Sequence, residues 1–208
     1  MNNKKLPGIP FVLSGPSGCG KGTIVKELLK KYPDTFALSV SATTRAPRVG
    51  EVDGVHYYFI TREEFERRID VQQILEYTSY CGNYYGTPKN ELYERTVSGI
   101  NGILEIEVEG AMNVRRLCPE AVLIYVLPPD AETLEARLRG RGTNTEEDIA
   151  NRLATAREEI RCLPDYDYIV INENDGAEAA ADEIVNIIAS EQHKVSRNLE
   201  NAIHFFDN

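Results

Sequence analysis

The chain has 208 residues, of which 42% are hydrophobic and 27% are charged, and its net charge at pH 7 is −10. This length and composition predict a single globular domain with a sizeable core, and the longest apolar runs, such as 121–129, are too short to cross a membrane. The acidic balance argues against a general nucleic-acid binder, which would normally carry a basic face. The first ten residues hold no long apolar segment typical of a secretory signal, so we expect a cytoplasmic protein with no membrane partner.

Strand and helix patterns alternate along the chain. We expect buried strands over 11–14, 37–41, 103–107, 121–127 and 167–172, and helices over 21–31, 88–98, 110–117, 130–139, 146–162 and 176–190. Thr87 before Pro88, and Thr145 before three acidic residues, predict the N-caps of two of these helices. This alternation is typical of an α/β fold in which helices cover both faces of a parallel sheet.

Two segments interrupt the alternation. Residues 42–87 are predicted to form a β-rich insertion, with strands over 55–60 and 74–80 and a short helix that begins after Thr61. Residues 137–152 combine arginines with glycines, a composition that predicts a mobile lid. The core of the single domain is then expected over 9–41, 88–136 and 153–190, and the tail 191–208, whose periodicity is weak, is expected to be peripheral or only partly ordered.

A glycine-rich segment joins the first predicted strand to the first predicted helix. Gly15, Gly20 and Lys21 match the spacing G-x-x-x-x-G-K of a phosphate-binding loop. Such a loop needs glycine because polyphosphate lies almost on the backbone, while the lysine supplies a charge for the β and γ phosphates. A plain turn between strand and helix is the alternative, which the apolar strand and the amphipathic helix on either side disfavour.

The residue after the lysine is Gly22 instead of the usual hydroxyl residue, and Thr23 comes one position later. We therefore expect Mg²⁺ to be held mainly by phosphate oxygens and water, with Thr23 as a candidate ligand. The four cysteines, Cys19, Cys81, Cys118 and Cys162, show no zinc or disulfide spacing. Because Cys19 lies in the loop near a helix N-terminus, where a thiol pKa can fall, we hypothesise that it is reactive and that ATP protects it.

A second anion site is expected in the insertion. Arg45 and Arg48 are three residues apart in a proline-containing loop, and each can offer a planar fork to a phosphate group. The hydroxyl groups of Tyr57 and Tyr85 can add neutral hydrogen bonds. A solvated loop and a half-buried tyrosine-bearing sheet face are the alternatives for these residues.

Four motifs together resemble the guanylate kinase family over about residues 9–190: Gly-Pro-Ser-Gly-x-Gly-Lys-Gly-Thr at 15–23, Ser-x-Thr-Thr-Arg-x-Pro-Arg-x-Gly-Glu at 41–51, Gly-Asn-Tyr-Tyr-Gly-Thr-Pro at 82–88 and Arg-Gly-Thr-x-Thr-Glu at 141–146. The resemblance implies a P-loop three-layer α/β/α fold, with a five-stranded parallel core sheet, a GMP-binding insertion and a mobile lid. It also implies ATP and GMP as substrates, with Mg²⁺ as the cofactor. The oligomeric state stays open.

The resemblance also implies the site residues. It implies that ATP binds to the phosphate loop and the lid arginines, with Asn172 near the adenine. The residues are Gly15, Pro16, Ser17, Gly18, Cys19, Gly20, Lys21, Gly22, Thr23, Arg137, Arg141, Arg152 and Asn172. Lys21, Arg45 and the three lid arginines are the implied catalytic residues. The phosphate of GMP is implied to bind Arg45, Arg48, Tyr57 and Tyr85. Its base is implied to bind Ser41, Glu76, Gly86 and Thr87, with Glu105 and Glu107 beside the base or the metal.

The hydrogen-bonding pattern of guanine supports the assignment of Glu76. One carboxylate can accept from both N1–H and the 2-amino group of guanine, while hydroxyl groups such as those of Ser41 and Thr87 can donate to O6. Adenine would turn a lone pair toward that carboxylate. For Glu76 alone, a solvent-facing position on an alternating strand is the alternative.

Two functional alternatives remain at the level of sequence. A guanylate-kinase-like interaction module would share the fold without the chemistry, but such modules typically lose the phosphate loop or the GMP loop. A P-loop kinase that phosphorylates another nucleotide or a phosphorylated sugar is the second alternative.

Overall fold

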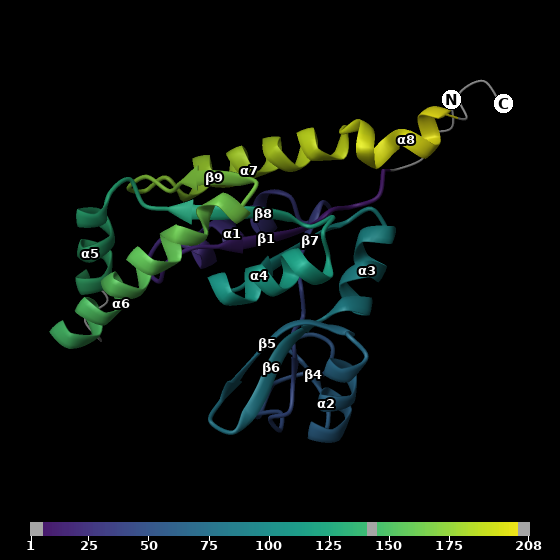
Figure 1. Ribbon diagram of the computed structural model, residues 1–208, viewed down its shortest axis with the longest axis horizontal. Helices are drawn as coiled ribbons and strands as arrows, with labels where there is room; N and C mark the ends of the chain where they lie inside the picture. The colour runs from purple at the N-terminus through teal and green to yellow at the C-terminus, as the bar shows by residue number, and fades with distance from the viewer. Residues whose placement is uncertain (1–5, 141–144, 204–208) are drawn as a thin grey trace.

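The computed structural model of the protein describes residues 6–140 and 145–203. Its main sheet has five strands, all parallel, in the order β2-β7-β1-β8-β9 (Figure 1). Their bounds are β1 (Pro10–Ser14), β2 (Phe36–Leu38), β7 (Asn101–Glu105), β8 (Val122–Leu127) and β9 (Tyr168–Ile171). The predicted α/β class with a five-stranded parallel sheet is therefore confirmed, and the carboxyl ends of β1, β7 and β8 meet at one edge.

Helices cover both faces of this sheet. On one face, Phe11 and Leu13 of β1 pack with α1 (Lys21–Lys31) and α7 (Ala177–Gln192). On the other face, Val12 packs with α3 (Lys89–Val97) and α4 (Val108–Leu117). Since alternate residues of a strand point to opposite faces, a central strand that is covered on both sides must be apolar throughout, as β1 nearly is.

The insertion forms a second sheet, drawn below the main sheet in Figure 1, with the order β4-β3-β6-β5. The bounds are β3 (Ala42–Thr43), β4 (Tyr58–Phe59), β5 (Ile74–Tyr80) and β6 (Asn83–Pro88), and α2 (Arg62–Asp70) packs on this sheet. The Thr61 hydroxyl caps α2 by accepting a hydrogen bond from the Glu64 amide at 3.2 Å, as the sequence predicts. The predicted strand over 55–60 shrinks to β4, and β3 and β6 were not predicted.

The α5 (Ala131–Gly140) and α6 (Glu146–Glu159) helices stand together at one end of the main sheet (Figure 1). Leu134 and Leu138 of α5 pack with Ile149 and Ala156 of α6. Thr145 caps α6 in a reciprocal capping box with Asp148, which confirms that prediction. The expected helix over 146–162 ends at Glu159, and a 3₁₀ helix (Ile160–Asp165) follows it.

The predicted N-cap of α3 is wrong. Thr87 lies in β6, and Pro88 occupies the N-cap position of α3 without a side-chain cap. The physical reason is that the Thr87 hydroxyl is committed elsewhere, because it donates to Glu76 Oε1 at 2.6 Å.

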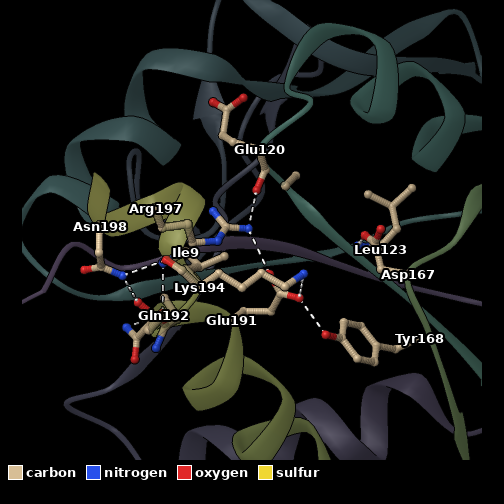
Figure 2. Close-up of polar contacts among 12 residues, drawn as sticks. Ile9, Glu120, Leu123, Asp167, Tyr168, Glu191, Gln192, Lys194, Arg197 and Asn198 are labelled. Carbon is tan, nitrogen blue, oxygen red and sulfur yellow. Dashed lines mark hydrogen bonds and ion pairs between the residues drawn. The ribbon is translucent and has the colours of Figure 1, made fainter. Parts of the chain in front are cut away.

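Part of the tail forms the helix α8 (Val195–Ile203). The α7–α8 junction is built around Glu191, which is 2% exposed (Figure 2). Tyr168 donates to Glu191 at 2.6 Å, and Lys194 and Arg197 pair with it at 2.5 and 3.3 Å. Burial alone would raise the pKa of Glu191, but these hydrogen bonds together lower it. The short apolar pattern of the tail could not reveal this anchor.

None of the helices within residues 6–140 and 145–203 combines the length and the apolar character needed to cross a membrane.

Candidate active site

The phosphate loop, residues 15–23, leaves β1 at the carboxyl edge of the main sheet. Gly15 and Gly20 have φ values of +142° and +96°. A Cβ on Gly15 would lie 2.3 Å from the carbonyl oxygen of Val126, and one on Gly20 would lie 2.2 Å from Asn172 Nδ2. Both the backbone conformation and the available space therefore require glycine at these two positions. Gly20 is the N-cap of α1 and offers no side chain, so the first amides of this helix stay free for an anion.

The side chain of Lys21 is folded over this loop. Its Nζ donates to the carbonyl oxygen of Gly15 at 2.5 Å and points toward that of Pro16 at 3.5 Å. Among the described residues, no carboxylate forms an ion pair with this ammonium group. An incoming polyphosphate would therefore compete with neutral carbonyl groups for Lys21 and not with a counter-charge.

A cavity of about 410 Å³ opens in front of the loop. It is lined by Ser17, Gly18, Gly20, Lys21, Gly22, Thr23, Lys26, Glu105 and Glu107. Burial raises the pKa of Glu105, and the positive charge of Lys21 partly opposes that shift. The cavity thus places two lysines, two carboxylates and two hydroxyl residues around one polar space.

These oxygen groups fit Mg²⁺. The ion prefers carboxylate, hydroxyl and phosphate oxygens, and it usually keeps several waters when it accompanies a nucleotide. Within the described residues, no group of three or more His, Cys, Asp or Glu side chains could enclose a metal. A Cβ on Gly22 would lie 3.4 Å from Glu105 Oε1, so this carboxylate lies beside the position where a hydroxyl residue usually stands. The residues present therefore suit an ion that arrives with the nucleotide.

Helix α6 reaches the loop through Arg152, whose Nη1 donates to the hydroxyl oxygen of Ser17 at 2.7 Å. Helix α5 reaches it through Arg137, whose guanidinium donates to the carbonyl oxygens of Cys19 and Asn172 at 3.4 and 2.8 Å. The third predicted lid arginine, Arg141, lies outside the described residues. Two of the three predicted arginines are thus connected to the phosphate loop.

Asn172 braces the loop from behind. It follows β9 and is 5% exposed, and its Nδ2 donates to the carbonyl oxygen of Cys19 at 2.7 Å. Its Oδ1 is buried without a hydrogen-bond partner among the described residues. In this conformation Asn172 supports the loop backbone, and its predicted position near the adenine stays a prediction.

The hypothesis that Cys19 has a low pKa is wrong. Its side chain is fully buried, and this burial raises the pKa of the thiol, although the positive charge of Lys21 acts in the opposite direction. Cys19 belongs to the apolar core cluster that contains Ile24 and Val126, and its Sγ lies 4.0 Å from Lys21 Nζ. A buried, protonated thiol is a poor nucleophile.

A second cavity, of about 550 Å³, lies between the insertion and α4. The insertion contributes Glu76, Tyr77, Thr78, Ser79, Tyr85 and Gly86, and the core contributes Ser41, Glu105, Ile106, Glu107, Glu109 and Gly110. Glu105 and Glu107 line both cavities. The two polar spaces are therefore adjacent and share a carboxylate wall.

Glu76 projects from β5 into this second cavity, so the alternative of a solvent-facing residue is wrong. Burial raises the pKa of its carboxyl, and the hydrogen bond from Thr87 acts against that shift. Thr87 is 1% exposed and donates to Oε1 at 2.6 Å. In this structure the Thr87 hydroxyl therefore orients the carboxylate, whereas the sequence predicts that it donates to a base oxygen.

Arg45 and Arg48 differ in whether their guanidinium groups have a hydrogen-bonded partner in the described part of the chain. Arg45 forms a bidentate ion pair with Glu51, with Nη–O distances of 2.8 and 2.9 Å, and its guanidinium lies 5.4 Å from the ring centre of Tyr57. The same Glu51 accepts from the Arg48 amide at 2.6 Å, while the Arg48 side chain is exposed. The rings of Tyr57 and Tyr85 meet edge to face with centroids 5.9 Å apart. The structure thus brings Arg45, Tyr57 and Tyr85 together.

Glu51 is the residue of this group to which the sequence analysis assigned no role. A carboxylate three residues beyond Arg48 in a turn-rich loop was the available signal, because it can close back on an arginine. Pairing with Arg45 and with the Arg48 amide lowers the pKa of the Glu51 carboxyl to about 2. The same ion pair raises the pKa of Arg45. The loop conformation depends on this carboxylate.

The fold and the site define a class of protein. A glycine-rich loop on a parallel sheet, a lysine at its helix, and a neighbouring polar cavity under an inserted sheet are the features of a P-loop kinase that phosphorylates a small acceptor. The sequence profile of the guanylate kinase family matches residues 8–191. This chain belongs to the guanylate kinase family.

Individual relatives agree with this assignment. The chain is 53% identical to guanylate kinase of Clostridioides difficile (strain 630) over 91% of both chains. It is 49% identical to guanylate kinase of Halalkalibacterium halodurans over 95% of both. The crystal structure of guanylate kinase from Anaplasma phagocytophilum superposes with a TM-score of 0.67 and 34% identity, over 97% of this chain and 96% of that one.

Proposed function

We propose that this protein transfers the γ-phosphoryl group of ATP to GMP, and also to dGMP, giving ADP and the corresponding diphosphate. One observation carries the proposal: two polar cavities share Glu105 and Glu107, and one lies on the phosphate loop while the other holds the Glu76–Thr87 pair. A donor and an acceptor bound in them would be neighbours. Positioning of this kind supplies much of the catalysis in phosphoryl transfer.

In the proposed mechanism, the polyphosphate of ATP lies on residues 15–23, and Lys21 exchanges its carbonyl partners for phosphate oxygens. Arg152 lies within reach because it already contacts Ser17. These cations stabilise the negative charge on the transferring group. Thr23, Glu105 and Glu107 would hold Mg²⁺ that arrives with ATP, and the ion would supply further neutralisation of that charge.

GMP is proposed to occupy the second cavity with its base at Glu76. The carboxylate accepts from N1–H and the 2-amino group, an arrangement that adenine cannot satisfy because its N1 is an acceptor. Its phosphate meets Arg45, Arg48, Tyr57 and Tyr85. Both Nη atoms of Arg45 pair with Glu51, so a phosphate oxygen bound there would share the guanidinium with that carboxylate.

No general base is needed, because the attacking phosphate oxygen of GMP is already anionic. What the protein must do is exclude water, which would otherwise accept the phosphoryl group. We assign that task to the predicted lid over 137–152, of which Arg137 and Arg152 already contact the phosphate loop. Mg²⁺ dependence and a cytoplasmic location stay predictions.

One assay tests the proposal. Production of ADP from ATP is measured with GMP, dGMP, AMP or dTMP as the acceptor, or with no acceptor, in the presence of Mg²⁺. We expect turnover with GMP and dGMP, and little turnover with AMP, with dTMP or without an acceptor. Turnover with AMP or dTMP equal to that with GMP would support a P-loop kinase of different specificity, and no turnover with any acceptor would support an interaction module.

A further inference from the structure

We propose that Gly110, in the first turn of α4, is a specificity-determining positioning residue: the lack of a side chain there lets the carboxylate of Glu76 lie against the helix in the position that reads the purine base. This inference rests on the proposed function, which assigns Glu76 to the base. Gly110 itself touches no substrate in this account and acts through Glu76.

The carboxylate of Glu76 is enclosed from two sides. On one side, Thr87 donates to Oε1 at 2.6 Å. On the other side, a Cβ on Gly110 would lie 3.2 Å from Oε2 and 3.4 Å from Cγ of Glu76. The first distance is shorter than side-chain carbons normally keep from such an atom, so an alanine at position 110 would displace the carboxylate by a few tenths of an ångström.

The residues around Gly110 leave little room for any group other than the Glu76 carboxylate to move. The Cβ would also lie 3.4 Å from Ile106 Cδ1, so it cannot move away from Glu76 without meeting an apolar side chain. Movement of the carboxylate toward Thr87 would compress a hydrogen bond that is already short. Glu76 is therefore the group that must reorient.

The close approach also has an electrostatic consequence. Gly110 is the third residue of α4, and the N-cap residue Glu107 forms no side-chain cap, so the first-turn amides keep their partial positive charge. The other titratable groups that line the cavity are Glu105, Glu107, Glu109, Tyr77 and Tyr85, and no lysine or arginine is among its described lining residues. The helix terminus and Thr87 are thus the groups that favour the charged form of Glu76 against its burial.

The test compares Gly110→Ala and Gly110→Val with the wild type, and with Arg116→Ala as a matched control on the exposed side of the same helix. KM and kcat are measured for GMP, for ATP and for inosine monophosphate, which has N1–H but lacks the 2-amino group. Since a misplacement of 1 Å can cost about 100-fold, we expect KM for GMP to rise about 3- to 10-fold in the alanine variant and further in the valine variant. The preference for GMP over inosine monophosphate should shrink, and KM for ATP should not change.

Stability separates positioning from a packing role. Alanine is a better helix former than glycine, so the melting temperature of Gly110→Ala should be equal to or above that of the wild type. The acid limb of the pH profile for GMP should also move to higher pH, because the displaced carboxylate is less well stabilised. The control should match the wild type in every measurement.

Three results would overturn the inference. They are an unchanged KM for GMP in both variants, an unchanged preference over inosine monophosphate, or a fall in melting temperature with equal losses for ATP and GMP. A wild-type protein that fails to phosphorylate GMP would instead overturn the proposed function, so the two failures are distinguishable.

Discussion

The hydrogen bond between Thr87 and Glu76 offers a direct test of how the base site works. Replacing Thr87 by valine keeps the shape of the side chain and removes only the hydroxyl group. That hydroxyl donates to Oε1 at 2.6 Å, and Thr87 is 1% exposed, so water cannot readily take its place. The variant therefore removes the side-chain donor of a buried carboxylate.

The size of the effect follows from the charge of the acceptor. A hydrogen bond to a charged group contributes about 1.5–3 kcal/mol, and about 1.4 kcal/mol corresponds to a tenfold change in affinity. Loss of the donor also raises the pKa of Glu76 further, because burial then acts with less opposition. We expect KM for GMP to rise about 10- to 100-fold at neutral pH, with the larger effect at lower pH, where more of the carboxyl is protonated.

Steady-state assays of ADP formation, with each substrate varied in turn, measure this effect. KM for ATP should stay within about twofold, because the phosphate loop belongs to the other cavity. Thr87→Ser is the matched control, since it keeps the hydroxyl and should retain most of the affinity for GMP. An unchanged KM for GMP in Thr87→Val, or equal losses in the serine and valine variants, would refute the reasoning.

Three further predictions concern other parts of the molecule. Lys21→Ala should lower kcat by at least about 100-fold, because it removes charge stabilisation in the transition state, and a loss below tenfold in single-turnover assays would contradict this role. Glu51→Gln should raise KM for GMP while sparing KM for ATP, because the amide cannot hold the Arg45 fork by two charged hydrogen bonds, and equal kinetics would show that Arg45 needs no positioning. Glu191→Gln should reduce the free energy of unfolding by about 1–3 kcal/mol at pH 7, because it weakens buried hydrogen bonds to a charged group. Since folding lowers the pKa of Glu191, that difference should shrink as the pH falls below the ordinary value of 4.5, and a difference that grows in acid, measured by denaturant titration, would be inconsistent with the sign of the shift.

Local sequence patterns were reliable where one residue determines one interaction. The helix after the phosphate loop begins at Lys21 and ends at Lys31 as predicted, because glycine spacing and an apolar face mark both its start and its length. Thr145 was identified as a cap because threonine followed by three acidic residues suits only a helix N-terminus. These signals lie within a few residues of one another.

Other patterns failed because their partners are distant along the chain. Thr87 before Pro88 resembles a cap, yet its hydroxyl bonds to a residue eleven positions earlier on a neighbouring strand. Cys19 resembles a reactive thiol, yet the fold turns it into the core. Strand β3 pairs with β4 and β6, and β6 pairs with β3 and β5; such pairing leaves a weak trace in any one segment alone.

The sequence by itself determined the class of fold, the phosphate-loop motif and the family resemblance, and it predicted that two arginines form a second anion site. These features rest on residue type and short spacing, which the chain carries however it is folded. Only the tertiary structure decided that Glu51 holds Arg45, that Thr87 orients Glu76, and that Gly110 leaves room for that carboxylate. The reason is physical: Glu51 closes on Arg45 only when the loop is folded, and the separations of Glu76 from Thr87 and Gly110 depend on how the inserted sheet packs on itself and on α4, which no local pattern encodes.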